Sequence, residues 1–217
     1  MEIKWYGHSC FLITSESGVR ILTDPYDPEV GYPMHKIACD AVSASHAHHD
    51  HNYFDMCEGN PVKITEPGEY EVGGIAVSGV STWHDAEHGA KRGRNIVFVF
   101  TIEDMRVVHA GDIGEVPDEA TLAAIGHADV LLVPVGGYYT IDAAGARALA
   151  NALDPKVVIP MHYRTDALDA HFKLAGIEPF IKSLENCAVH RLRQSECTLT
   201  KASLGSDRVI TLEYARE

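Results

Sequence analysis

Apolar and polar positions follow different patterns in the two halves of the chain, and the change predicts the order of its elements. Strand-like runs bounded by turn residues cover 3–14, 19–24, 62–65, 75–82, 95–102 and 106–111. Helical spacing with terminal signals predicts helices at 117–128, 142–153 and 165–176. Two further runs, 128–137 and 155–162, are apolar throughout, which is typical of strands buried on both faces. This order predicts an α/β protein with two sheets covered by helices, folded as a single domain over 1–217.

Composition and charge narrow the class of protein. Hydrophobic residues make up 46% and charged residues 23% of the 217 positions, as in ordinary globular domains. The net charge of −13 opposes non-specific attraction to nucleic acid or anionic lipid, so we expect neither as a partner. No apolar run approaches the roughly 20 residues that span a bilayer, and the first ten residues lack a secretory pattern. Five scattered cysteines without C-x-x-C spacing indicate reduced thiols, so we expect a cytoplasmic protein. A homo-oligomer is compatible with the sequence.

Candidate chemistry is concentrated in Ser45–His51, SHAHHDH, which holds four histidines and an aspartate in seven residues. These side chains follow the strand-like run 39–45, and three more candidates follow later runs: His84, Asp112 and His162. Side chains at the carboxyl ends of strands converge on one edge of a sheet, where open sheets usually hold their sites. We therefore expect these residues to lie together.

The spacing within the cluster is suited to metal binding. Residues i and i+2 of an extended stretch point the same way, so His46 and His48 can bind one ion. The turn that follows directs Asp50 and His51 at a second ion, and nitrogen with carboxylate oxygen suits zinc, manganese or iron. Two ions about 3.5–4 Å apart bind a water molecule and lower its pKa, which makes hydroxide the nucleophile. The remaining ligands are His84 for the first ion, His162 for the second, and Asp112 as the bridge.

Other interpretations of these residues stay open. A histidine-rich loop also forms incidental metal-binding surfaces or solvated turns. Asp85 and His88 are close rivals of His84 for the third position of the first site. His49 is expected to point away from its neighbours in the extended stretch.

Three further motifs accompany HAHHDH along the chain: LTDP, HAGD and MHY. HAHHDH matches the H-x-H-x-D-H signature of the metallo-β-lactamase superfamily, and the other three resemble its early aspartate, later aspartate and later histidine motifs. GHSCFLI, PGEYEVGG, HDAEHGAKRGRN and PVGGYYTIDA also resemble a compact branch of metal-dependent hydrolases related to the ascorbate-6-phosphate lactonases. The resemblance covers most of the chain and is specific for fold and metal, not for substrate.

This resemblance implies a four-layer αββα sandwich with a dinuclear site, usually zinc, along one edge. Asp24 would orient a ligand histidine from behind, a role that metal sites generally need filled. The third motif departs from the family pattern, reading TWHDAEHG, so the choice of His84 over His88 rests on register. Carried over residue by residue, the resemblance gives one metal to His46, His48 and His84, the other to Asp50, His51 and His162, and the bridge to Asp112.

Cationic residues close to the motifs predict where an anionic substrate would bind. Lys91, Arg92 and Arg94 follow the third motif and form a candidate cationic lip, to which Arg164 after MHY can add. Guanidinium groups pair well with phosphate or carboxylate. The alternative is a solvated, charge-rich turn.

Other candidate contacts come from loops around the same strand ends. Tyr138 and Tyr139 lie in a glycine-flanked loop, where they either hydrogen-bond an oxyanion or serve packing alone. His8 is either a substrate contact or a histidine hydrogen-bonded at a strand end. Asp50, beside the nucleophile, is a candidate proton shuttle, and Asp85 is a further candidate acid.

Together these features predict a hydrolase with two divalent ions, in which Asp50 and Asp112 are catalytic. The bond cleaved is expected to be an ester, lactone or phosphoester of a small anionic molecule. A phosphodiesterase or nuclease of the same fold is the first alternative. A diiron oxidoreductase is disfavoured because His48 stands where those proteins carry glutamate, and a non-catalytic metal-binding protein is disfavoured because all seven ligand positions are filled.

Overall fold

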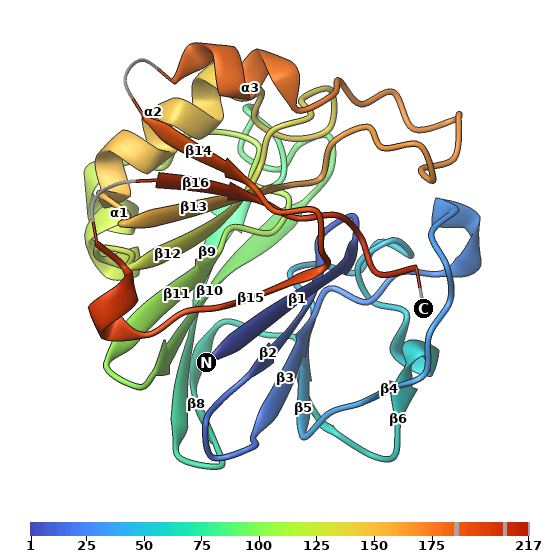
Figure 1. Cartoon of the computed structure of the whole chain (residues 1–217). Coiled ribbons are helices and arrows are strands. Elements are labelled where there is room, and N and C mark those ends of the chain that lie inside the picture. Colours follow the sequence, from blue (N-terminus) through green and yellow to red (C-terminus); the bar gives the residue numbers. More distant parts are fainter. Residues whose placement is uncertain (185–186, 206–207, 217) are drawn as a thin grey trace.

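Two β-sheets stacked face to face form the body of the molecule, with α-helices beside the larger sheet (Figure 1). The computed structural model describes residues 1–184, 187–205 and 208–216. The loops that follow β5, β9, β11 and β13 lie at one edge of the two sheets, and this edge carries the candidate site. None of the described helices has the length and apolar character needed to cross a lipid bilayer.

The smaller sheet has six strands in the order β15-β1-β2-β3-β5-β7. Its amino-terminal strands β1, β2 and β3 form an antiparallel meander, and β15 joins β1 antiparallel. The pairs β3–β5 and β5–β7 are parallel, so the chain leaves this sheet repeatedly at the same edge. The bounds are β1 Glu2–Gly7, β2 Cys10–Thr14, β3 Arg20–Thr23, β5 Ala41–Ser43, β7 Val62–Ile64 and β15 Glu196–Thr198.

The larger sheet has eight strands in the order β14-β16-β13-β12-β11-β10-β9-β8. It is antiparallel from β8 to β11 and parallel from β11 to β14. The bounds are β8 Gly68–Val72, β9 Ile75–Trp83, β10 Arg94–Ile102, β11 Met105–His109, β12 Val130–Pro134, β13 Val157–Met161, β14 Ala188–Arg191 and β16 Arg208–Thr211. A two-stranded ribbon is formed by β4 Ile37–Ala38 and β6 Cys57–Glu58.

Three α-helices occur among the described residues, and Figure 1 shows them beside the larger sheet: α1 Glu119–Ile125, α2 Ala143–Leu153 and α3 Glu178–Ser183. Asp118 and Asp142 cap the first two through bonds from backbone N–H groups to their carboxylates. Short 3₁₀ turns lie at η1 Pro28–Val30, η2 Phe54–Met56 and η3 Lys201–Ser203. The expected α/β class is therefore confirmed, with the α-helices on one side of the stacked sheets.

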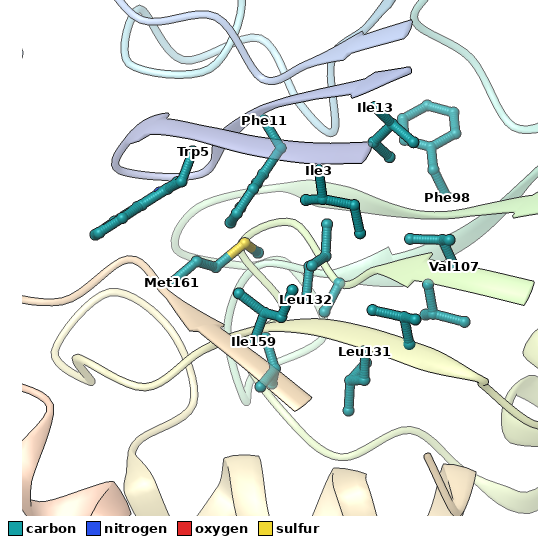
Figure 2. Close-up of a cluster of buried hydrophobic side chains, with 14 of the residues drawn as sticks. Ile3, Trp5, Phe11, Ile13, Phe98, Val107, Leu131, Leu132, Ile159 and Met161 are labelled. Carbon is teal, nitrogen blue, oxygen red and sulfur yellow. The ribbon is translucent and has the colours of Figure 1, made fainter. Parts of the chain in front are cut away.

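The core fills the space between the two sheets (Figure 2). From the smaller sheet, Ile3, Trp5 and Phe11 point inward, and Leu132 and Met161 approach them from the larger sheet. All five are at most 2% exposed. Each such side chain contributes roughly 1.5–3 kcal/mol through burial, so the sheets form a rigid base for the loops at their edge.

The structure divides the predicted strand 3–14 into two strands. The chain turns at His8, whose φ of 52° lies in the left-handed region, and Cys10 begins β2. The apolar pattern runs on through this turn because both strands bury side chains in the same core. This turn places His8 at the edge of the sheet instead of within it.

The predicted helix over 165–176 is wrong. This segment is a loop whose apolar residues, Leu168, Phe172 and Leu174, are each buried. Their spacing resembles a helical stripe, but the loop is held by Arg164, whose Nη1 donates to the carbonyl groups of Leu168 and Asp169. The helix of this region is α3, which starts after the loop, and Pro179 in its first turn was the available signal.

Candidate metal centre

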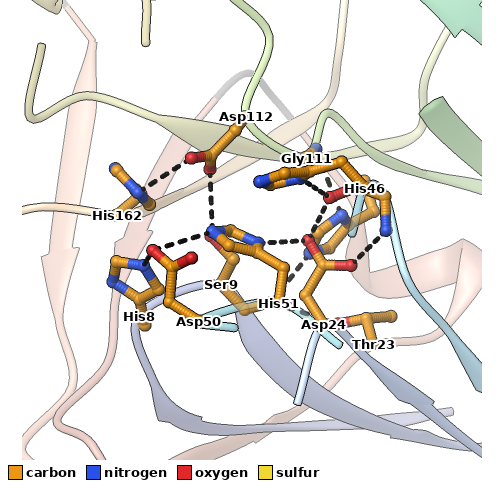
Figure 3. A network of polar contacts seen from close by, with 12 residues as sticks. His8, Ser9, Thr23, Asp24, His46, Asp50, His51, Gly111, Asp112 and His162 are labelled. Atoms are coloured by element: carbon orange, nitrogen blue, oxygen red, sulfur yellow. Dashed lines mark hydrogen bonds and ion pairs between the residues drawn. The ribbon is translucent and has the colours of Figure 1, made fainter. Parts of the chain in front are cut away.

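Histidine and carboxylate side chains from separate elements meet at one edge of the sheets (Figure 3). The loop after β5 supplies the SHAHHDH residues, and single residues follow β9, β11 and β13: His84, Asp112 and His162. The turn between β1 and β2 adds His8. Strand ends therefore bring together residues up to 154 positions apart in sequence, from His8 to His162.

The first group consists of His46, His48 and His84, whose potential ligand atoms all lie within 4.8 Å of one another. Burial, and then the charge of His51, lowers the pKa of His46 well below its ordinary value, and burial also lowers the pKa of His84. Both are therefore neutral at pH 7, the form that binds metal. His48 is exposed, so this group opens to solvent.

The second group consists of His8, Asp50, His51 and His162, again with ligand atoms within 4.8 Å of one another. His8 Nε2 lies 3.2 Å from Asp50 Oδ2. Burial, followed by the charge of His162, lowers the pKa of His8 to about 4. Burial alone would raise the pKa of Asp50, but His51 and His8 lower it, so the carboxylate is ionised. The histidines of this group are at most 1% exposed, and the Asp50 side chain is 13% exposed.

Asp112 lies between the two groups. Its Oδ2 is 3.1 Å from His162 Nε2 and 3.5 Å from His84 Nε2, and its Oδ1 is 3.3 Å from His51 Nε2. Burial alone would raise the pKa of Asp112, but His162 and His51 hold it well below its ordinary value. An ionised carboxylate that touches both groups is placed to bridge two cations.

The donor set fits divalent metal ions. His46 Nδ1 is hydrogen-bonded to Ser45 Oγ, while His46 Nε2 is buried with no hydrogen-bond partner. His51 Nε2 and Asp112 Oδ1 are also buried, and the 3.3 Å contact between these two atoms is an ion-pair contact, not a well-formed hydrogen bond. Buried polar atoms without partners are costly, and a bound cation satisfies several of them at once.

Asp24 holds this cluster from behind. Its carboxylate accepts hydrogen bonds from Ser45 N (2.7 Å) and Ser45 Oγ (2.6 Å) and contacts His51 Nδ1 at 2.8 Å. Burial would lower the pKa of His51, but Asp112 and Asp50, together with Asp24, raise it well above its ordinary value. Asp24 therefore fixes the His51 ring so that Nε2 faces the cluster.

Several of these residues adopt backbone angles that L side chains rarely take. The φ angles are 52° for His8, 42° for Asp24 and 50° for His162. The left-handed region costs roughly 1–2 kcal/mol for a residue other than glycine. Such conformations persist where the surrounding structure enforces them, and they concentrate at functional sites.

Two residues behind the cluster were missed by the sequence analysis. Asn95 Oδ1 accepts from the N–H of Asp112, and Asn95 Nδ2 donates to Thr82 Oγ1. His109 Nδ1 accepts from Gly111 N, so its Nε2 carries the proton that it donates to Ser9 O. Each is a buried polar residue within an apolar strand run, and that exception to the pattern was the available signal.

The structure separates His84 from its rivals. The His88 side chain is 78% exposed and faces Glu115 instead of the cluster. Asp85 turns its carboxylate into the following loop, where it accepts four backbone N–H bonds, from Glu87, Gly89, Lys91 and Arg92. Burial acts to raise the pKa of Asp85, but these bonds lower it, so Asp85 is a poor candidate for a proton-donating acid. As expected, His49 points away, with its Nδ1 2.8 Å from Asp27 Oδ2.

The predicted substrate contacts fall into different places. Arg94 lies with His46 and His48 along a cleft of about 410 Å³. Tyr138 and Tyr139 line a second cavity of about 190 Å³ beside Asp85. The guanidinium group of Arg164 instead binds the carbonyl groups of the 165–176 loop, so it stabilises that loop.

Comparison with known proteins places this arrangement in context. A family model described as a beta-lactamase superfamily domain matches residues 2–162. A UPF0173 metal-dependent hydrolase of Carboxydothermus hydrogenoformans is 30% identical over 196 residues, covering 76% of this chain and 85% of the relative. A crystal structure from Thermotoga maritima, assigned to the metallo-β-lactamase superfamily, is 39% identical, has a TM-score of 0.81 and covers 98% of both chains. A metallo hydrolase of Ignicoccus hospitalis, 21% identical with a TM-score of 0.65 over 99% of this chain and 95% of that one, is similar in fold.

Proposed function

The chain belongs to the metallo-β-lactamase superfamily, and from its cluster of histidines and carboxylates we propose that it is a metal-dependent hydrolase with a dinuclear centre. The proposed substrate is a small anionic molecule with an ester, lactone or phosphoester bond. One observation carries the proposal: Asp112, ionised and buried, contacts His84 of the first group and two histidines of the second. A carboxylate shared by two groups is suited to two cations, not one.

We assign the ligands from the two groups. Zinc agrees with the nitrogen and oxygen donors and with the description of the Thermotoga maritima relative, which names zinc, while manganese and iron also accept such donors. Ions held there would lower the pKa of a water molecule and polarise the oxygen of the scissile bond. The proposed ligands are His46, His48 and His84 for one ion, Asp50, His51 and His162 for the other, and Asp112 for both.

His8 and Asp24 position these ligands through contacts at their rear. His8 Nε2 faces the same oxygen of Asp50 that lies 3.7 Å from His51 Nε2, so His8 fixes the orientation of that carboxylate. His8 is also close enough to compete as a ligand. Asp24 holds the His51 ring through Nδ1.

Asp50 is the proposed proton carrier. It is ionised, and its side chain is the more accessible of the two carboxylates in the cluster, 13% exposed against 3% for Asp112. It can therefore accept a proton from the attacking water and return it to the leaving group. Asp112, enclosed by three histidines, stays ionised and holds the centre together.

A phosphodiesterase that acts on a small diester is the second candidate. The cleft beside His46 and His48 contains Arg92 and Arg94, which suits a phosphate group as well as a carboxylate. The net charge of −13 opposes a long polyanion, so this alternative favours a small diester over a nucleic acid.

Elemental analysis with hydrolysis assays tests the proposal. We expect about two zinc ions per wild-type chain and turnover of at least one among a lactone, a carboxylic ester and bis-p-nitrophenyl phosphate. Asp112→Ala should lose metal and at least about 10²-fold in activity, because even residues behind metal ligands typically affect activity 10–100-fold. Asp27→Ala is the control, since the Asp27 side chain contacts the outward-facing His49 and the backbone N–H of Glu29, and neither residue belongs to the two groups. A folded wild-type protein that takes up no metal, or binds it without hydrolysing any of these substrates, would refute the proposal.

A further inference from the structure

We infer that Arg92 is the residue that recognises the anionic group of the substrate, with Asp85 as the residue that positions it. This inference rests on the proposed hydrolase function and specifies its substrate: a molecule that carries a carboxylate or phosphate-type oxyanion separate from the scissile bond. The sequence left Lys91, Arg92, Arg94 and Arg164 as equivalent cationic candidates, and their surroundings in the structure distinguish them.

Two of the four cations are already engaged. Lys91 forms an ion pair with Glu87 on the outside of the loop. Arg164 donates to two carbonyl groups of the 165–176 loop. Of the two that remain, Arg94 is exposed, whereas Arg92 is half-buried with its Cζ 5.4 Å from the centre of the Tyr139 ring. Among the described residues, no carboxylate forms an ion pair with Arg92, so its charge is available to a ligand.

Arg92 also occupies the position that a substrate-binding cation requires. It lines the cleft that contains His46 and His48, and it lines the smaller cavity that contains Tyr138 and Tyr139. Arg92 thus lines both the cleft and the smaller cavity, whereas Arg94 lines only the cleft. An oxyanion bound there would lie beside the first group of candidate metal ligands.

A row of aromatic rings connects Arg92 to the second group. Tyr139 lies edge-on to Phe172 with ring centres 6.4 Å apart, and Phe172 lies edge-on to His8 at 5.5 Å. The Arg92 guanidinium covers the outer end of this row. Phe172 and His8 are both buried, so this row links Arg92 to the second group through packed side chains.

Asp85 holds the loop in this conformation. Its two carboxylate oxygens accept four backbone N–H groups between Glu87 and Arg92, and the shortest bond, 2.7 Å, comes from Arg92 itself. Asp85 directly follows the candidate ligand His84, so one short segment fixes both the metal ligand and the recognition residue. Gly114 packs against the same backbone, where a Cβ would come within 2.2 Å of Asp85 N.

The chemistry of guanidinium explains the choice of ligand. Its planar fork pairs with two oxygens of a carboxylate or phosphate, and the Tyr139 face restricts its orientation before binding. In a chain with a net charge of −13, the guanidinium groups of Arg92 and Arg94 along the cleft provide local attraction for an anion, and only that of Arg92 is half-buried.

The test uses three p-nitrophenyl esters and the zinc-loaded enzyme. The butyrate is neutral, the hemisuccinate carries a carboxylate and the 3-phosphonopropionate carries a phosphonate at the same position. Arg92→Gln should lower kcat/KM for at least one anionic ester about tenfold or more, through KM, because charged hydrogen bonds of this kind are lost. The butyrate should change less than about twofold. The ester with the larger loss identifies whether carboxylate or phosphate is recognised.

Matched variants separate recognition from general damage to the site. Arg92→Lys keeps the charge without the fork and should retain part of the preference. Asp85→Asn should reduce the preference for the same anionic ester while leaving the zinc content unchanged. Arg20→Gln is the control variant away from the site, because Arg20 lies on β3 and pairs with Asp40. Equal losses on all three esters in Arg92→Gln, or a selective loss in Arg94→Gln instead, would overturn the inference.

A binding measurement keeps the inference testable if no ester is hydrolysed. Calorimetry with succinate and 3-phosphonopropionate on the zinc-loaded protein should show binding that Arg92→Gln weakens about tenfold. That result with no turnover would refute the proposed hydrolase while supporting Arg92. The absence of binding to the wild-type protein, or equal binding to the variant, would refute the assignment of Arg92.

Discussion

The two groups of candidate ligands meet at Asp112, yet water reaches them differently. The first group, His46, His48 and His84, contains an exposed histidine and opens into the cleft with the arginine loop. The second group is enclosed and bound into a network in which Asp24 and His8 hold its members. The open group is therefore arranged for access by substrate, and the enclosed group is arranged for fixed geometry.

Electrostatics follow the same division. Burial leaves His46 and His84 neutral, with lowered pKa values and no carboxylate that belongs to their group alone. In the enclosed group, Asp112 and Asp50 raise the pKa of His51 in spite of burial. The first group thus resembles a ready set of neutral ligands, whereas the second is a network of opposite charges that an incoming cation must rearrange.

The largest expected difference between the two groups is the change in the free energy of unfolding when one histidine of each group is replaced by alanine. His51 is fully buried between Asp24, Asp50 and Asp112. Removing a partner from a buried charged network typically costs about 3–5 kcal/mol, so metal-free His51→Ala should be destabilised by roughly this amount. His48→Ala, at an exposed position, should change the free energy of unfolding by less than about 0.5 kcal/mol.

Denaturant unfolding of both metal-free variants measures this difference, with circular dichroism as the check that each is folded. Both variants should lose metal, because each removes a proposed ligand. Equal effects on stability would show that the two groups do not differ in their structural role.

The contrast also explains how far the sequence could predict the site. The open group came from i, i+2 spacing and a motif, which are local signals. The contact of His8 with Asp50 depends on a left-handed turn between two strands, and no local pattern distinguishes that turn from a continuous strand. The sequence therefore left His8 as either a substrate contact or a histidine hydrogen-bonded at a strand end, and the structure places it against the candidate ligand Asp50.

The fold shows the same limit. The central strands β12 and β13 were predictable because they are apolar throughout, and helix α2 because its apolar periodicity reflects the face that it buries. The loop over 165–176 imitates that periodicity with three apolar residues that pack separately. Short strands such as β15 contain too few residues for a period to be seen, and their pairing with β1 depends on tertiary contacts.

Asp24→Asn is the next sharper test, because it removes a charge that contacts the enclosed group directly and the open group only through Ser45. The Asp24 carboxylate contacts His51 but no histidine of the open group other than through Ser45. Loss of such a partner typically costs 10–100-fold in metal affinity, and we expect this loss at the enclosed site. Chelator competition should therefore show one weakened zinc ion and one nearly unchanged.

Asp27→Asn provides the matched control for Asp24→Asn. Asp27 contacts His49 at the same 2.8 Å as Asp24 contacts His51, but His49 is half exposed and points away from the cluster. The zinc affinities of the Asp27→Asn variant should equal those of the wild-type protein. A loss of the same size in both variants would mean that general charge, not the contact with His51, controls binding.

Proton release gives the smallest and most specific difference between the groups. His51 has a raised pKa and is protonated in the metal-free protein at pH 7, so a metal ion must displace its Nε2 proton. His46 and His84 have lowered pKa values and bind without releasing protons. Zinc calorimetry of His48→Ala in two buffers with different ionisation enthalpies should therefore detect about one proton released by the enclosed group. The zinc affinity of this variant should fall about tenfold for each unit by which the pH decreases. Release of no proton would show that Asp24, Asp50 and Asp112 do not hold His51 in its charged form.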